Sequence, residues 1–133
     1  MRFLDKSARG ERSLVMTKID KPWGYELLLG EWCGWRVKIL HITKGHRLSK
    51  QYHREKVEYM FNLNDETWEF IQPFKIHRPK AQDDNCTIME LSKGSDEDIV
   101  RLEDDYGRVE NPSAEFEIQE IYGLPVSKDM LAY

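Results

Sequence analysis

The chain has 133 residues, the length of one domain with a core of its own. Apolar residues make up 40% of it and charged residues 33%, and no apolar run approaches the roughly 18 residues of a membrane-spanning helix. It opens without a signal-peptide pattern, and Cys33 and Cys86 lack the spacing of a zinc-binding pair. We therefore expect a cytoplasmic protein with reduced thiols and no membrane partner.

The net charge of −4 conceals two regions of opposite sign. Residues 38–56 carry six Lys or Arg against one acid, whereas residues 83–120 carry thirteen acids against three bases. A basic region raises the local concentration of anionic ligands. We expect an anionic ligand near the basic region. No recognition-helix pattern accompanies it, so we expect no nucleic-acid partner.

Short alternating segments separated by turn residues run along most of the chain. Residues 1–18 show little periodicity and predict an N-terminal arm or an edge strand, and residues 113–133 predict a tail. The tail contains a possible strand at 116–121 and a helical turn capped by Ser127. Further strands are predicted at 25–29, 35–42, 57–63, 67–71, 87–91 and 99–102. This pattern indicates an all-β barrel or sandwich.

Residues 45–58, Gly-His-Arg-Leu-Ser-Lys-Gln-Tyr-His-Arg-Glu-Lys-Val-Glu, hold the densest group of candidate ligands. In a strand, Ser49, Gln51 and His53 project from one face. An amide, an imidazole and, five residues on, the carboxylate of Glu58 are possible ligands of a divalent cation. The polar outer face of an edge strand explains the same pattern, so these residues alone leave both interpretations open.

Several motifs occur together along the chain. They are Lys21-Pro22-Trp23-Gly24-Tyr25, Leu48-Ser49-x-Gln51-x-His53-x4-Glu58, Ile76-His77-Arg78, and Asp96-Glu97-Asp98-Ile99-Val100-Arg101 continuing to Asp105-Tyr106-Gly107-Arg108. Over about residues 20–108 the chain resembles the cupin domain of type II phosphomannose isomerases. That domain is best known as the C-terminal half of bifunctional mannose-1-phosphate guanylyltransferase/phosphomannose isomerases. The resemblance implies a double-stranded β-helix, the cupin barrel, over residues 19–112.

The resemblance also implies a metal site. The metal of this family is usually held by four side chains, three of which map onto Gln51, His53 and Glu58. The fourth is a histidine at the end of a Pro-x-Gly-x-x-His-like turn, and it maps onto His77, with Gln82 as the alternative in a rival frame. This donor set implies a divalent cofactor, with Zn²⁺ expected first and Mn²⁺, Co²⁺ or Fe²⁺ as alternatives.

The activity implied is isomerisation of mannose-6-phosphate to fructose-6-phosphate, within carbohydrate metabolism and polysaccharide biosynthesis. A phosphorylated hexose needs cationic and hydroxyl partners, and the candidates are Ser49, Lys56, Arg101 and Arg108. Each candidate also has a purely structural interpretation. Ser49 could be a strand hydroxyl and Lys56 a solvated charge, and the two arginines could pair with nearby acids. The sequence does not identify the general base of this reaction, and His46 and Glu69 are only guesses for that role.

The chain departs from the family pattern between Glu58 and His77. Only nineteen steps separate them, enough for two strands and the Asn64-Asp65 turn, where relatives carry an additional β-hairpin. A shortened wall would leave the cavity more open or completed by another subunit, because an exposed sheet edge invites pairing. We therefore expect a homodimer. A non-catalytic cupin that binds a sugar or sugar phosphate, or a structural remnant of the fold, are the alternatives to an isomerase.

Overall fold

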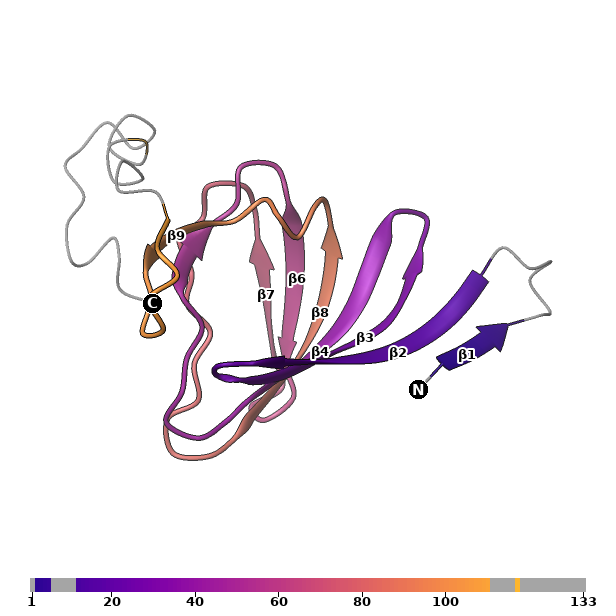
Figure 1. The fold of residues 1–133 in the computed structure, drawn as a ribbon, viewed down its shortest axis with the longest axis horizontal. Helices are drawn as coiled ribbons and strands as arrows, with labels where there is room; N and C mark the ends of the chain where they lie inside the picture. Colours follow the sequence, from indigo (N-terminus) through magenta and orange to yellow (C-terminus); the bar gives the residue numbers. More distant parts are fainter. Residues whose placement is uncertain (1, 6–11, 111–116, 118–133) are drawn as a thin grey trace.

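The computed structural model describes residues 2–5, 12–110 and 117, and the regular elements within them are β-strands (Figure 1). The strands are β1 (Arg2–Asp5), β2 (Arg12–Lys21), β3 (Gly24–Trp32), β4 (Trp35–Ile42), β5 (Lys50–Tyr52), β6 (Val57–Asn62), β7 (Thr67–Ile71), β8 (Cys86–Lys93) and β9 (Val100–Glu103). The predicted all-β class is confirmed. None of the described segments is a helix of the length and hydropathy needed to cross a membrane.

Seven strands form one antiparallel sheet in the order β1-β2-β3-β4-β8-β6-β7. The late strand β8 lies between β4 and β6, and β7 stands at one edge with β6 as its neighbour. Strands β5 and β9 form a separate two-stranded sheet, set apart from β6–β8 in Figure 1. The isolated bridges Arg47↔Lys80 and Gln51↔His77 attach the segment 77–80 to the β5 side. Strand β5 therefore lies between β9 and the segment that carries His77.

Alternation along the strands gives the large sheet an inner face that changes from apolar to charged. On β4, Ile42 and Leu40 are buried and are followed by the buried Lys38, and on β8 the buried Ile88 is followed by the buried Glu90. The apolar end belongs to a core cluster of nine buried residues: Trp23, Leu40, Ile42, Leu48, Met60, Ile71, Ala81, Cys86 and Ile88. The charged end, with Lys38 and Glu90, faces a cavity.

A smaller core cluster supports the two-stranded sheet. Tyr52, Val100 and Leu102 are buried together, with Phe74 and Ile76 packed against them. This cluster fixes β5 and β9 relative to the segment before His77. Of the polar side chains on β5, that of Gln51 is thereby held toward the large sheet.

The strands predicted at 35–42 and 67–71 coincide with β4 and β7, and the other predicted strands between residues 25 and 102 differ from the observed ones by one to three residues at an end. Strand β2 runs across the expected start of the domain at residue 19. The predicted strand at 116–121 and the cap at Ser127 lie outside the described residues, apart from Glu117.

Candidate metal centre

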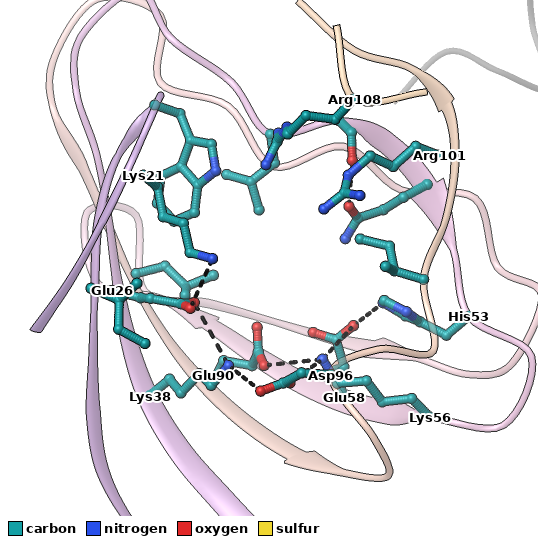
Figure 2. Close-up of a pocket in the computed structure, with 17 residues that line it drawn as sticks. Lys21, Glu26, Lys38, His53, Lys56, Glu58, Glu90, Asp96, Arg101 and Arg108 are labelled. Atoms are coloured by element: carbon teal, nitrogen blue, oxygen red, sulfur yellow. Dashed lines mark hydrogen bonds and ion pairs between the residues drawn. The ribbon is translucent and has the colours of Figure 1, made fainter. Parts of the chain in front are cut away.

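A cavity of about 280 Å³ opens between the inner face of the large sheet and the β5–β9 side. Figure 2 shows charged side chains from both sides pointing into it. Seven of the predicted site residues line this cavity: Ser49, Gln51, His53, Lys56, Glu58, Arg101 and Arg108. His77 is fully buried and lies behind this wall, against Gln51 and Glu58. Gln82, the alternative fourth ligand, is exposed and does not line the cavity.

Three of the predicted metal ligands form a compact buried group. The candidate ligand atoms of His53, Glu58 and His77 all lie within 4.8 Å of one another, and all three residues are buried. Glu58 Oε1 contacts His53 Nε2 and lies 3.6 Å from His77 Nε2. Two imidazole nitrogens and a carboxylate oxygen are a donor set suited to Zn²⁺ and neighbouring divalent metals.

Main-chain carbonyls fix how the two imidazole rings are oriented. His53 Nδ1 lies 2.6 Å from the carbonyl oxygen of Asp98, and His77 Nδ1 lies 2.9 Å from that of Lys75. A carbonyl oxygen can only accept, so each Nδ1 carries a proton and donates it. In a neutral ring the Nε2 lone pair then faces Glu58, which is how metal-binding histidines are commonly held.

Two buried atoms of this group lack a hydrogen-bond partner within the described part of the chain. They are His53 Nε2 and Glu58 Oε1, which face each other. Facing lone pairs repel, and unpaired buried polar atoms are costly. A divalent cation between them, or a second proton on His53, removes this cost. Because a third donor atom, from His77, converges on the same carboxylate oxygen, the residues fit a metal ion.

Gln51 borders the ligand group but presents its amide differently. Its Oε1 accepts a hydrogen bond from Ser49 Oγ at 2.6 Å, and its Nε2 lies 3.3 Å from His77 Nε2. Since His77 Nδ1 carries the proton, the amide donates to Nε2. Ser49 thus positions Gln51, and Gln51 positions His77. Because this hydrogen bond uses the Nε2 lone pair of His77, metal binding would require the amide of Gln51 to turn away from His77. The same turn would bring the amide oxygen of Gln51 toward the metal as a fourth ligand.

A network of ion pairs continues the site along the inner face (Figure 2). Lys56 Nζ lies 3.2 Å from Asp96, 3.7 Å from Glu90 and 3.9 Å from Glu58. Burial alone would lower the pKa of Lys56, but these carboxylates outweigh it and raise the pKa. Lys38 Nζ continues the network, 2.8 Å from Asp96 and 3.7 Å from Glu26. Lys56 is therefore a buried, paired charge and not a solvated one.

The same surroundings act on the carboxylate of Glu58. Burial by itself would raise the pKa of Glu58, but hydrogen bonds from His53 and His77, when their Nε2 atoms carry a proton, and the charge of Lys56 hold the pKa well below its usual range. Glu58 is therefore ionised at neutral pH. An ionised carboxylate is the form that binds a metal.

Glu90 is a site residue that sequence reasoning did not single out. It is buried on the inner face of β8, lines the cavity, and has an Oε1 without a hydrogen-bond donor among the described residues. Burial, together with the charge of Glu58, raises the pKa of Glu90 to about 8. The available signal was a carboxylate at an inward position of β8, two residues after the buried Ile88.

The two guesses for a general base lie elsewhere. The ring of His46 stacks on that of Tyr106, with 6.4 Å between the ring centroids. Glu69 pairs with Lys75 at 3.0 Å. Neither residue lines the cavity, so neither guess is supported.

The two predicted arginines differ in their partners. Arg108 is held by the carboxylate of Asp104, with Nε–Oδ2 and Nη2–Oδ1 distances of 2.8 and 3.0 Å. Arg101 forms no ion pair in the described ranges, and its buried Nε has no hydrogen-bond partner there. Burial and the neighbouring charge of Arg108 lower the pKa of Arg101. Figure 2 shows its guanidinium pointing into the cavity, where an anion would satisfy it.

A scan of protein-family models found no match to this chain, and a search of the curated proteins found none either. The cavity brings together candidate metal ligands, an ionic network and the guanidinium of Arg101, which forms no ion pair with the described residues.

Proposed function

We propose that this protein is a metal-dependent sugar-phosphate isomerase that converts mannose-6-phosphate to fructose-6-phosphate. The observation that carries the proposal is the buried group of His53, Glu58 and His77 beside a polar cavity. The choice of sugar and of reaction rests on the motifs that resemble those of type II phosphomannose isomerases. Two sheets facing each other across the cavity agree with a double-stranded β-helix, and we propose this fold for residues 19–112.

Different residues of the site would bind the metal and the phosphate. His53, Glu58 and His77 would hold the metal, with Gln51 as a possible fourth ligand. A divalent metal bound there would act as a Lewis acid toward the oxygens of an enediolate. Arg101, which forms no ion pair with the described residues, offers a part-buried guanidinium to the phosphate.

Aldose–ketose isomerisation also needs a group that moves a proton between two adjacent carbons. Glu90 is the candidate, because it lines the cavity with an oxygen that accepts no hydrogen bond from the described residues. Glu58 is committed to the two histidines, and Asp96 is committed to Lys38, Lys56 and Arg36. We assign Glu90 this role on its position.

The test combines metal analysis with a coupled assay for fructose-6-phosphate. The purified protein should carry about one equivalent of a divalent metal, and mannose-6-phosphate should turn over. His53→Ala should lose both, whereas the exposed Glu97→Ala should keep both. Absence of turnover with Zn²⁺, Mn²⁺ and Co²⁺ each supplied would refute the isomerase.

A non-catalytic sugar-phosphate-binding protein is the second candidate. The short β6–β7 connection favours it, because β7 stands at the edge of the sheet where a longer wall would continue. Such a protein would bind mannose-6-phosphate in calorimetry, with Arg101→Met weakening the binding, and would release no fructose-6-phosphate. A structural remnant would bind neither metal nor sugar.

A further inference from the structure

The outer face of the seven-stranded sheet, which points away from the cavity, carries apolar side chains in register. Strands β7, β6, β8 and β4 are neighbours in this sheet (Figure 1), and their outward positions are paired in register. They form two rows, which together we name the outer apolar face: Phe70–Tyr59–Leu91–Val37 and Trp68–Phe61–Met89–Ile39. The buried residues that alternate with them, such as Glu58, Met60 and Glu90, face the interior.

The β7 end of this face is open to solvent. Trp68 is 63% exposed, Phe70 44% and Tyr59 40%. Tyr59 and Phe70 have ring centroids 4.8 Å apart, and Phe61 and Trp68 have centroids 4.6 Å apart. The rings support one another across the two strands. The remaining members of the two rows are half-buried.

A sheet that is apolar on both faces needs a layer on each face. The inner face is covered by the core and by the β5–β9 side. The exposure of the three rings shows that no described segment covers the outer apolar face at its β7 end. We therefore expect another apolar surface to pack against the β7 end of the outer apolar face.

From this face we infer that a second copy of the chain packs against it, sheet on sheet, across a two-fold axis. The area fits: an aromatic side chain buries about 150–250 Å² when covered, so the three rings and their half-buried neighbours offer on the order of 500 Å². A stable dimer buries about 800 Å² per partner, of which about 60% is apolar.

The charge on this face also favours a second copy. Lys93 is the charged side chain that faces outward beside these rows on β4, β6, β7 and β8, and it lies over the ring of Trp35 at 5.9 Å. Two identical faces can approach without strong repulsion, as a two-fold interface requires. A glycan would instead need several hydrogen-bonding groups among the rings, and the two rows contain only the hydroxyl of Tyr59 and the indole N–H of Trp68. We therefore assign the face to self-association.

The experiment measures the mass of the full-length protein by sedimentation equilibrium, from about 1 to about 100 µM. The wild type should be a dimer. Trp68→Glu and Phe70→Glu should be monomers across the range, with unchanged circular dichroism. Val109→Glu is the matched control, because Val109 is an apolar residue 43% exposed after β9, outside the large sheet, and the variant should stay dimeric.

If the Glu variants fail to fold, Trp68→Ser removes contact area without adding a charge. Because a two-fold interface contains residue 68 of both copies, the substitution removes contact area twice. The dimer dissociation constant should therefore rise about 100-fold. A wild type that stays monomeric at the highest concentration overturns the inference, whatever else binds this face. A dimer of unchanged affinity in Trp68→Ser and in any soluble Glu variant also overturns it.

Discussion

Arg101 and Arg108 lie side by side in the cavity wall, but only Arg101 is without an ion-pair partner in the described residues. A charged hydrogen bond to a phosphate contributes about 1.5–3 kcal/mol. Arg101→Met should therefore raise the KM for mannose-6-phosphate by roughly 10- to 100-fold, with a smaller effect on kcat. Arg47→Met is the control, since Arg47 pairs with Asp105 outside the cavity, and its KM should not change. Equal effects of the two variants would contradict a phosphate contact at Arg101.

Asp98 supports the loop between two candidate metal ligands, His53 and Glu58, and is not one of the candidates. Its carboxylate accepts hydrogen bonds from the backbone N–H groups of Arg54, Glu55 and Lys56, between His53 and Glu58 in the sequence. Asp98→Ala should weaken metal affinity by about 10- to 100-fold, as loss of such outer support usually does. Competition with a chelator measures this affinity. The exposed Glu97→Ala should retain wild-type affinity, and a matching loss there would point to general disturbance of the loop.

The individual residues of the site were predictable to different degrees. Gln51, His53 and Glu58 lie close in sequence, so strand periodicity and the motif together place them. His77 is distant, and only the motif frame selected it over Gln82. The carbonyls that orient the imidazole rings could not be predicted, because a main-chain oxygen leaves no signature in the amino-acid sequence.

At the scale of elements, the start of β3 depends on Gly24. This glycine has φ of 151°, and a Cβ there would lie 1.9 Å from the carbonyl oxygen of His41 on β4. Backbone strain of about 1–3 kcal/mol and the clash should together lower the free energy of unfolding of Gly24→Ala by about 3 kcal/mol or more. Gly45→Ala has a positive φ but open space, so it should cost about 1 kcal/mol. Chemical denaturation compares the two, and equal losses would exclude the close approach as the cause.

The strands were more predictable than their arrangement. Alternation identified β4, β6 and β7 because apolar side chains recur at every second position of each strand, where they form the outer apolar face. Strand β2 was expected as an arm or edge because its charged residues hide the period, yet it pairs with β3 over most of its length. The insertion of β8 between β4 and β6 is a long-range pairing that no local pattern encodes.

At the scale of the whole molecule, one sheet carries two unlike faces. The inner face brings the charged ends of β3, β4, β6 and β8 together with β5 and β9 around a cavity. The outer apolar face ends at β7, the edge strand of the sheet. The short connection alone already led us to expect a second subunit. The exposed rings of Trp68 and Phe70 now indicate which face it would cover.

Acid should destabilise the molecule through the loop after β9. Asp104 accepts hydrogen bonds from the backbone and guanidinium of Arg108, and its side chain is fully buried. Burial alone would raise the pKa of Asp104, but Arg108 outweighs it and lowers the pKa. Because the native pKa lies below the unfolded value of about 3.9, the unfolded state binds the proton first as pH falls. The stabilisation is therefore complete above about pH 4 and is lost as pH falls through the native pKa.

Asp104→Asn should remove this stabilisation at every pH. At pH 7 the variant should unfold with about 2 kcal/mol less free energy than the wild type, the contribution of a buried charged hydrogen bond. The gap should narrow below about pH 4, where protonation of Asp104 in the wild type removes the same interaction. Urea denaturation from pH 7 to pH 3 measures both curves, with the exposed Asp83→Asn as the control for loss of one charge. Parallel curves for the wild type and Asp104→Asn over the whole range would show that the carboxylate is not what Arg108 stabilises.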